Sequence, residues 1–300
     1  MSDDAVTVQA HAKINLFLRV LAREADGFHG VETLYCLVGL ADTLRVERRD
    51  AKEITIEVEG DDVGPAERNL AVRGADLVVD ATGRRFGVHV TLVKRIPMRA
   101  GLGGGSSDAA AALHATNRLV NGAVPRHELL QFAARLGSDV PFFASEAPLA
   151  LGWGHGERLL QLPPLPAAPA LLLTPAVGID TAAAYGWVDA ARISAGRRGA
   201  LALDLDALSR WGDIGRMAGN DFESVVFERF PAVRAAFEAL AGTRPLVCRM
   251  SGSGSTLFAI YRSARDRDDA RLMLGRKHGR LDAVETLATP AAPAFAPVPA

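Results

Sequence analysis

The residue types with the clearest chemical meaning lie in one short segment, residues 97–107. Four glycines, at positions 101 and 103–105, fall within five residues and are followed by Ser106 and Ser107. Glycines let backbone amides approach a ligand closely, and the two hydroxyls supply donors and a helix cap. An alanine-rich helix pattern follows at once, and a helix start favours anions. The segment therefore predicts a loop that holds nucleotide phosphates.

Two commoner phosphate-binding loops do not fit this segment. No Lys-Ser or Lys-Thr pair closes the glycine run, as a Walker loop requires. Ser106 stands where the third glycine of a dinucleotide fingerprint belongs. A flexible glycine turn between a strand and a helix remains the structural alternative, but the two serines and the immediate helix favour phosphate binding.

Two other segments carry side chains suited to proton transfer. Lys13 and Asn15 lie two residues apart in an apolar run, so a strand places both on one face. A half-exposed edge strand without a functional role is the structural alternative. Asp139 follows Gly137 and precedes a Val-Pro-Phe-Phe run, a pattern also typical of a polar turn after a helix. Placed together, Asp139 could accept a hydroxyl proton while Lys13 stabilises the developing negative charge.

An aromatic residue and a histidine offer a way to hold a flat ring. Residues 26–29 read Asp-Gly-Phe-His, and Asp-Gly is a strong turn signal. Phe28 could stack on a nucleobase, and His29 could hydrogen-bond its edge. A plain surface turn is the alternative for residues 26–29.

The elements that must position these residues are a mixture of strands and helices. Strands are expected over residues 6–9, 14–20, 43–47, 54–58, 88–93, 170–174, 245–250 and 256–261. Helices are expected over residues 70–79, 108–120, 126–136, 182–191, 230–240 and 264–274. The fold class is therefore α+β or mixed α/β. A proline-rich stretch at 163–169 predicts a junction between domains spanning 1–162 and 163–287, with a Pro/Ala-rich tail at 288–300.

Composition excludes several classes of protein. The chain has 300 residues, 49% of them hydrophobic and 23% charged, as in ordinary globular proteins. Its net charge of −1 argues against a nucleic-acid binder. No signal peptide or apolar span is evident, so we expect no membrane association. The distant Cys36 and Cys248 form neither a disulfide framework nor a zinc pattern, as expected for buried thiols in the cytoplasm.

The glycine segment, with Pro97 and the run Gly-Leu-Gly-Gly-Gly-Ser-Ser, resembles the ATP loop of the GHMP small-molecule kinases. This form of the loop is similar to that of one branch, the 4-diphosphocytidyl-2-C-methyl-D-erythritol kinases. Three further runs resemble motifs of that branch and occur in the same order. They are Ala-Lys-Ile-Asn-Leu at 12–16, Asp-Gly-Phe-His at 26–29 and the Asp-Val-Pro-Phe run beginning at Asp139. A second glycine loop at 250–256 resembles the third GHMP motif. The resemblance implies a two-domain α+β kinase that uses ATP with Mg²⁺.

The resemblance also implies a role for each matching residue. Lys13 and Asp139 would be catalytic, with no residue assigned as a metal ligand. Nucleotide-binding residues would be Asn69, Lys94, Pro97, Gly101, Leu102, Gly103, Gly104, Gly105, Ser106 and Ser107. Substrate-binding residues would be Asn15, Phe28, His29, Thr181 and Tyr185. Tyr185 could stack on a base or equally be an ordinary tyrosine on a helix surface. One departure is Arg99, which stands where the family usually has a small residue.

The implied reaction is phosphorylation of the 2-hydroxyl of 4-diphosphocytidyl-2-C-methyl-D-erythritol in the non-mevalonate isoprenoid pathway. The implied partner is that small molecule alone, and the implied protein is a cytoplasmic monomer or homodimer. One rival is a different GHMP kinase, acting on homoserine, a sugar or a mevalonate intermediate; residues 26–29 weigh against it, because those substrates carry no base. Another is a non-catalytic nucleotide-binding protein, which would need neither Lys13 nor Asp139.

Overall fold

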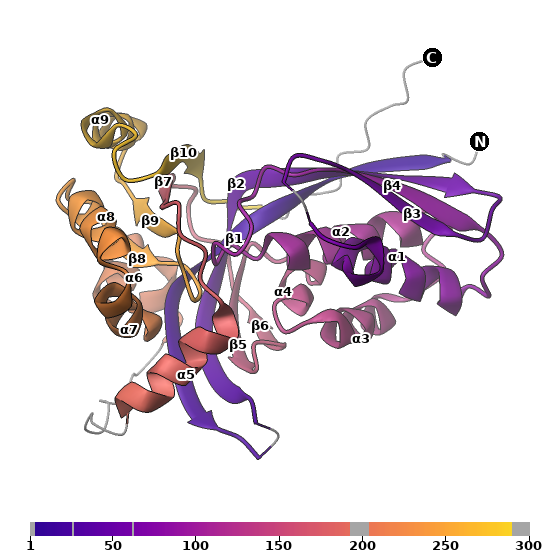
Figure 1. Cartoon of the computed structure of the whole chain (residues 1–300), viewed down its shortest axis with the longest axis horizontal. Helices are drawn as coiled ribbons and strands as arrows, with labels where there is room; N and C mark the ends of the chain where they lie inside the picture. Colours follow the sequence, from indigo (N-terminus) through magenta and orange to yellow (C-terminus); the bar gives the residue numbers. More distant parts are fainter. Residues whose placement is uncertain (1–3, 26, 62, 193–203, 290–300) are drawn as a thin grey trace.

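The computed structural model describes residues 4–25, 27–61, 63–192 and 204–289, so Asp26 and most of the predicted tail lie outside the described residues. Two β-sheets, each covered by helices, lie side by side, and the long strands β1 and β2 extend from one towards the other (Figure 1). We call them the N-terminal sheet and the C-terminal sheet. Both strands and helices occur in each half, as the sequence predicts.

The N-terminal sheet is organised around β2. Its strands are β1 (Ala5–Arg23), β2 (His29–Arg49), β3 (Ile54–Glu59), β4 (Gly87–Val93), β5 (Leu149–Gly154) and β6 (Arg158–Gln161). One edge of β2 pairs with β1 along most of its length. The other edge pairs with β5 through residues 31–36 and with β4 through residues 43–49. The side chains of β2 are mostly buried on both faces, since Leu34 and Cys36 join one hydrophobic core and Tyr35 and Leu37 join another.

Helices cover one face of this sheet: α1 (Leu70–Ala81), α2 (Gly104–Leu119), α3 (Arg126–Leu136) and the short α4 (Val140–Ala144) (Figure 1). Small residues on α2 allow a close approach to α1 and to the strands, since Ala109, Ala112 and Ala115 are buried in the core. Leucine and phenylalanine side chains from α2, α3 and α4 complete a second part of that core. These contacts fix the start of α2, which follows the predicted phosphate loop.

The C-terminal sheet has the strand order β10-β7-β9-β8. Its strands are β7 (Pro169–Thr174), β8 (Val247–Met250), β9 (Leu257–Ile260) and β10 (Arg280–Glu285). The helices of this half are α5 (Thr181–Arg192), α6 (Trp211–Met217), α7 (Phe222–Arg229), α8 (Pro231–Ala241) and α9 (Ala264–Leu274). Leu171 and Leu173 of β7 join the core formed with these helices. Ala170 and Leu172 join the core formed with β1, so β7 is buried on both faces.

The helices and strands expected from the sequence are present in the structure, with few differences. Each expected helix and strand lies within an observed element of the same type or overlaps one by most of its length. The expectation of two separate strands at 6–9 and 14–20 is wrong, because both belong to β1. The first half of β2, together with α4, β5, β6, α6, α7 and β10, was not anticipated. These pieces are short or contain glycine and polar residues, and pairing or packing with distant segments holds them.

The two sheets separate between Gln161 and Pro169, but one hydrophobic core contains residues of both, such as Ile14 and Phe258. The domain limits of 1–162 and 163–287 therefore stay a prediction. Within the described residues, no helix is long and apolar enough to cross a membrane.

The contact between α1 and α2 gives a test of packing. A Cβ atom at Gly74 would lie 2.7 Å from the carbonyl oxygen of Ala109. We expect Gly74→Ala to lower the free energy of unfolding by about 1–2 kcal/mol, because overpacking costs roughly 1–3 kcal/mol and outweighs the better helix propensity of alanine. Urea denaturation measures the change. In the control Gly212→Ala on α6, nothing lies within 4 Å of the new Cβ, so stability should stay level or rise; equal behaviour of both variants would contradict the close contact.

Candidate active site

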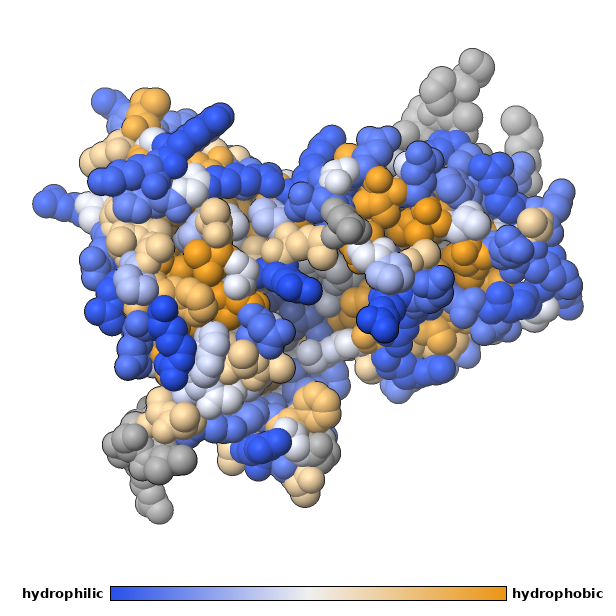
Figure 2. Space-filling view, viewed as in Figure 1, coloured by the Kyte–Doolittle hydropathy of each residue, from blue (hydrophilic) through white to orange (hydrophobic). Residues whose placement is uncertain are grey.

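A cavity of about 1170 Å³ opens between the two sheets. On the face shown in Figure 2, the surface is hollowed between the two halves of the molecule. Of the predicted site residues, all but Ser107 line this cavity: Lys13, Asn15, Phe28, His29, Asn69, Lys94, Pro97, Gly101, Leu102, Gly103, Gly104, Gly105, Ser106, Asp139, Thr181 and Tyr185. The structure thus brings together motifs that are far apart in the sequence.

The glycine loop is held by its carbonyl groups. The carbonyl of Leu102 accepts from the amide of Lys13 at 3.0 Å, and that of Ala100 accepts from the amide of Thr256 at 3.1 Å. The Ser251 hydroxyl donates to the carbonyl of Gly101 at 2.8 Å. Within the described part of the chain, the amides of residues 101–106 donate to no protein acceptor. A loop with bound carbonyls and open amides at a helix start is suited to bind an anion.

Two glycines in this loop are required by its geometry. Gly101 and Gly103 have φ angles of 78° and 71°, in the left-handed region that favours glycine. A Cβ atom at Gly101 would lie 2.0 Å from the carbonyl oxygen of Ser251, and one at Gly103 would lie 2.9 Å from the Phe143 ring. The loop therefore reaches this position only because these two residues lack a side chain.

Ser106 and Ser107 do not cap helix α2 as the sequence predicts. Helix α2 begins at Gly104 with Gly103 as its N-cap, and no side chain caps it. Both serines lie inside the first turn, so the prediction of a serine cap is wrong. Ser106 lines the cavity. Ser107 is only 3% exposed, and its hydroxyl donates to the carbonyl of His11 at 2.7 Å. Its hydroxyl thus joins α2 to β1 rather than lining the cavity.

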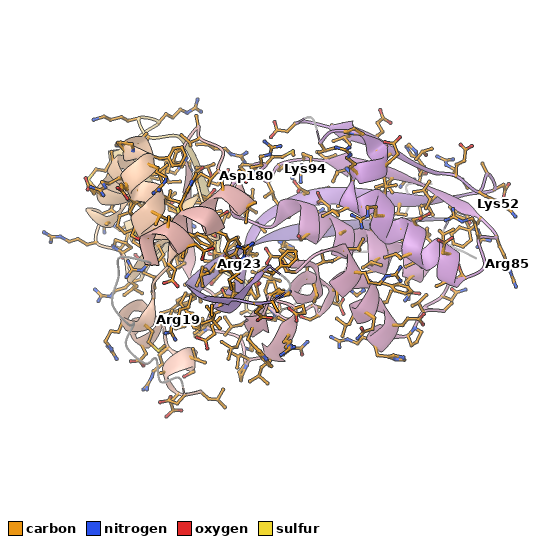
Figure 3. All side chains as sticks on the ribbon, turned by 60° about the horizontal axis from the view of Figure 1, so that its bottom comes forward. Arg19, Arg23, Lys52, Arg85, Lys94 and Asp180 are labelled. Carbon is orange, nitrogen blue, oxygen red and sulfur yellow. The ribbon has the colours of Figure 1, made fainter. Side chains whose placement is uncertain are left out.

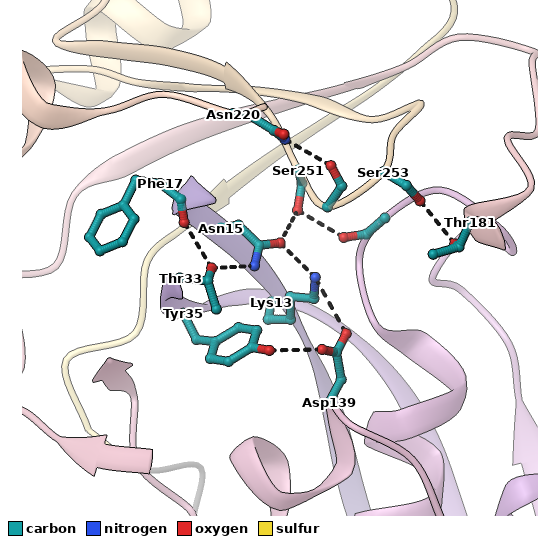
Figure 4. A network of polar contacts seen from close by, with 12 residues as sticks. Lys13, Asn15, Phe17, Thr33, Tyr35, Asp139, Thr181, Asn220, Ser251 and Ser253 are labelled. Atoms are coloured by element: carbon teal, nitrogen blue, oxygen red, sulfur yellow. Dashed lines mark hydrogen bonds and ion pairs between the residues drawn. The ribbon is translucent and has the colours of Figure 1, made fainter. Parts of the chain in front are cut away.

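Lys13 and Asp139 meet as the sequence predicts (Figure 4). The Lys13 ammonium donates to Oδ1 of Asn15 at 2.6 Å and lies 3.5 Å from Oδ2 of Asp139. The Lys13 side chain is only 4% exposed, whereas that of Asp139 is 30% exposed to the cavity. A buried cation beside a carboxylate that a ligand can reach is the arrangement needed to move a proton from an acceptor hydroxyl.

Irregular pairing in β1 helps to aim these side chains. The register between β1 and β2 shifts between His11 and Ala12 and again between Asn15 and Phe17. Such bulges redirect side chains and are frequent next to active sites. Asn15 is further fixed because it donates to the Thr33 hydroxyl at 2.7 Å, and this hydroxyl donates to the Phe17 carbonyl at 2.8 Å. The face that carries Lys13 is therefore rigid.

The predicted base-binding residues lie at the far end of the cavity, near the tip of the β1–β2 hairpin. The His29 and Tyr185 rings stack with centroids 5.0 Å apart and planes at 13°. Asp189 on α5 lies 2.7 Å from Nε2 of His29, a contact that sequence reasoning did not foresee. Phe28 is 65% exposed, and its ring lies 5.3 Å from that of His155. Thr181 at the start of α5 shares a 2.9 Å hydrogen bond with Ser253.

Lys94 lies in a buried cluster of charges. Figure 3 labels Lys94 in the half built on the N-terminal sheet and Asp180, next to Thr181, in the facing half. The Lys94 ammonium forms ion pairs with Asp42 and, at 2.8 Å, with Asp108. Burial alone would lower the pKa of Lys94, but the two carboxylates outweigh it and raise this pKa. Asn69 accepts from the amide of Ala71 and so caps α1. Both residues line the cavity while also serving the fold.

Sequence reasoning missed several residues that line the cavity. They include Thr33, Tyr35 and Asp189. Tyr35 contacts the predicted catalytic aspartate directly, because its hydroxyl donates to Oδ1 of Asp139 at 2.9 Å. Thr33 and Tyr35 alternate with the apolar Leu34 and Cys36, but this alternation is too weak to assign either residue to a site. Asp189 lies on a predicted helix, but only the tertiary structure brings it to His29.

Comparisons with known proteins agree with this geometry. A family model for the GHMP kinases N terminal domain matches residues 69–147, and one for the GHMP kinases C terminal matches residues 202–281. The chain is 41% identical to a 4-diphosphocytidyl-2-C-methyl-D-erythritol kinase from Solibacter usitatus, over 85% of this chain and 81% of the relative. The chain belongs to this family of GHMP kinases. The predicted family and two-domain α+β architecture are thereby confirmed.

Another relative and a crystal structure match more than nine-tenths of this chain. A relative of the same name from Pelobacter propionicus is 35% identical, over 94% of this chain and 99% of the relative. A crystal structure of 4-(cytidine 5'-diphospho)-2C-methyl-D-erythritol kinase superimposes with a TM-score of 0.77 at 34% identity, covering 93% of this chain and 98% of that chain. A homoserine kinase from Cytophaga hutchinsonii has a TM-score of 0.72 at 20% identity, which shows a shared fold.

The buried charge cluster predicts how the stability of the kinase depends on pH. Burial is the main cause that raises the pKa of Asp108 to about 7; Asp42 adds to it, and Lys94 opposes it. An aspartate whose pKa is raised on folding stabilises the protein below its unfolded pKa, near 4, and loses this effect as the pH rises through 7. We expect Asp108→Asn to flatten this fall in the free energy of unfolding.

Urea denaturation at a series of pH values between 4 and 8 measures the slope. The exposed Asp50, which follows β2, supplies a matched control. Asp50→Asn should keep the slope of the unmodified protein. An Asp108→Asn variant that also keeps this slope would show that Asp108 gains no proton on folding.

Proposed function

We propose that this kinase transfers the γ-phosphoryl group of ATP to the 2-hydroxyl of 4-diphosphocytidyl-2-C-methyl-D-erythritol, in the non-mevalonate route to isoprenoid precursors. The observation that carries the proposal is the Lys13–Asp139 pair, 3.5 Å apart, in the cavity that the open amides of the glycine loop also line. Relatives at 35% and 41% identity carry the name of this activity.

Asp139 acts as the general base in this proposal. Oδ2 of Asp139 takes the proton of the acceptor hydroxyl as its oxygen forms a bond to the γ-phosphorus. The bond from this phosphorus to the oxygen bridging the β- and γ-phosphates breaks, and ADP leaves. Lys13 is fixed by Asn15 and lies beside Oδ2, so its ammonium stabilises the negative charge that develops between acceptor and phosphate.

The glycine loop holds the phosphates of ATP through its backbone. The amides of residues 101–106 are open, and the start of α2 adds its positive dipole end. Lys94 and Asn69 line the same cavity beyond the loop, and a contact of either residue with the nucleoside end remains part of the proposal. The Ser107 hydroxyl stabilises the start of α2 because it donates to the carbonyl of His11 on β1.

Mg²⁺ fits the residues present. Among the described residues no group of three or more histidine, cysteine, aspartate or glutamate side chains could hold a metal ion alone. Mg²⁺ is commonly held by phosphate oxygens with one or two protein ligands, and the Ser106 hydroxyl and the buried, unpartnered Oδ1 of Asp108 are candidates for these ligands. When bound, the ion neutralises charge on the phosphates.

The cytidine end of the substrate gives the site its selectivity. Phe28, His29 and Tyr185 line the end of the cavity next to α5, and aromatic faces can stack on a base. Binding energy gained far from the reacting hydroxyl can position it in line with the γ-phosphate. Homoserine and mevalonate carry no base, so this aromatic group favours a cytidine substrate over those of other GHMP kinases. A cytoplasmic monomer or homodimer completes the proposal.

ADP release with different acceptors tests the proposed function. We expect turnover with the cytidine substrate and none with homoserine or mevalonate. Asp139→Asn should lower kcat by roughly 10²–10⁴, the usual contribution of a general base, while Asp50→Asn should leave it unchanged. A folded protein without turnover on the cytidine substrate would refute the function. Near-normal turnover by Asp139→Asn would refute only the assignment of the base.

Tyr185 gives a separate test of the cytidine end. We expect Tyr185→Ala to raise KM for the cytidine substrate by about 5- to 150-fold, because stacking on a base contributes roughly 1–3 kcal/mol, and to leave KM for ATP unchanged. Tyr185→Phe keeps the ring and should keep KM. Steady-state kinetics with each substrate varied in turn gives both constants. An unchanged KM in Tyr185→Ala would remove this residue from the substrate site.

A further inference from the structure

Tyr35 is the feature of the cavity that the proposed chemistry leaves without a role. It lies on β2, and its hydroxyl donates to Oδ1 of Asp139 at 2.9 Å. The other carboxylate oxygen, Oδ2, faces the Lys13 ammonium at 3.5 Å. The two oxygens of Asp139 therefore have different partners, one a neutral donor and the other a cation (Figure 4).

The position of the Tyr35 ring is tightly determined. The ring stacks on Phe142, with centroids 4.7 Å apart. A Cβ atom at Gly152 would lie 2.6 Å from the ring, and one at Gly156 would lie 2.6 Å from the hydroxyl oxygen. The Lys13 ammonium lies 5.7 Å from the ring centroid, within reach of a cation–π interaction. Two glycines thus leave room for a tyrosine whose hydroxyl can hardly move.

The Tyr35 hydroxyl stays a donor at neutral pH. Burial is the main cause that raises the pKa of Tyr35 well above its ordinary value, and the Asp139 carboxylate adds to this effect. The other titratable groups that face the pair are Lys13 from β1, Tyr185 from α5 and Glu157 from the turn after β5. Among these groups only Lys13 is a cation, so Asp139 has Tyr35 as its neutral donor and Lys13 as its cationic partner.

We propose that Tyr35 is a positioning residue for phosphoryl transfer: its hydroxyl holds Oδ1 of Asp139 so that Oδ2 faces Lys13 and the acceptor hydroxyl. The side chain of Asp139 is 30% exposed to the cavity, so without this bond it can turn away from Lys13. The inference rests on the proposed function, since it assigns Tyr35 a part in that reaction.

Tyr35→Phe tests the inference, since it removes the hydroxyl and keeps the ring. We expect kcat for the cytidine substrate to fall about 10-fold, with both KM values unchanged. A misplaced base lowers the rate, because a displacement of 1 Å can cost roughly 10²-fold.

A matched control and a double variant separate positioning from a general loss of stability. The Tyr261 hydroxyl shares a hydrogen bond with Thr243 in the other half of the molecule, so Tyr261→Phe should leave kcat unchanged. When Asp139 is already asparagine, adding Tyr35→Phe should lower kcat no further, because the two residues act as one unit. Full additivity of the two substitutions, or a raised KM with normal kcat in Tyr35→Phe, would overturn the inference.

Crystal structures of the unmodified protein and of Tyr35→Phe, without substrates, separate this inference from the function. We expect the Asp139 carboxylate to turn away from Lys13 in the variant. A protein that shows this change but does not turn over the cytidine substrate would refute the proposed function and keep the contact. A protein that turns over the substrate normally in both forms, with Asp139 in the same position, would refute the role of Tyr35 alone.

Discussion

Three hydrogen bonds to the carbonyls of Ala100, Gly101 and Leu102 determine how the rest of the site is arranged. Their donors come from β1, through Lys13, and from the loop between β8 and β9, through Ser251 and Thr256. Both sheets therefore hold the same short segment. Because the carbonyls point towards the protein, the amides of residues 101–106 stay open for an anion. The amide that binds Leu102 belongs to Lys13, so one residue both anchors the phosphate loop and brings a cation to it.

The two lysines that line the cavity are equally buried, and they differ in the exposure of the carboxylates beside them. The Lys94 ammonium lies between Asp42 and Asp108, and all three side chains are almost inaccessible. Breaking such a buried group would leave uncompensated charge, so it stabilises one arrangement of the strand that leads to the loop. Lys13 faces one carboxylate and one amide oxygen, and Asp139 is open to the cavity. The second pair can therefore exchange a proton with a substrate, whereas the first holds the fold.

The sequence predicts site residues that lie in short motifs, and it does not predict those that reach the site only through contacts between distant segments. Lys13, Asp139 and the glycine loop could be recognised because each lies in a compact motif of fixed spacing. Tyr35 and Asp189 could not, since the first lies in a part of β2 that alternates weakly and the second gains meaning only when α5 reaches His29. The serine cap failed for a related reason: Gly103 adopts a left-handed conformation and starts the helix itself, which places both hydroxyls inside the first turn.

The length of β2 links the two ends of the acceptor site. His29, at its start, faces the aromatic group with Tyr185, and Tyr35, six residues later, contacts Asp139. Six residues of extended strand span about 20 Å. Tyr185 from α5 faces Asp139 as well, since burial first and then the Asp139 charge raise the pKa of Tyr185. Because β2 is fixed by β1 on one edge and by β4 and β5 on the other, the positions of His29 and Tyr35 cannot easily change. In the proposed function, β2 thus holds a residue of the aromatic group at one end and the partner of the base at the other, while Tyr185 approaches the base from α5.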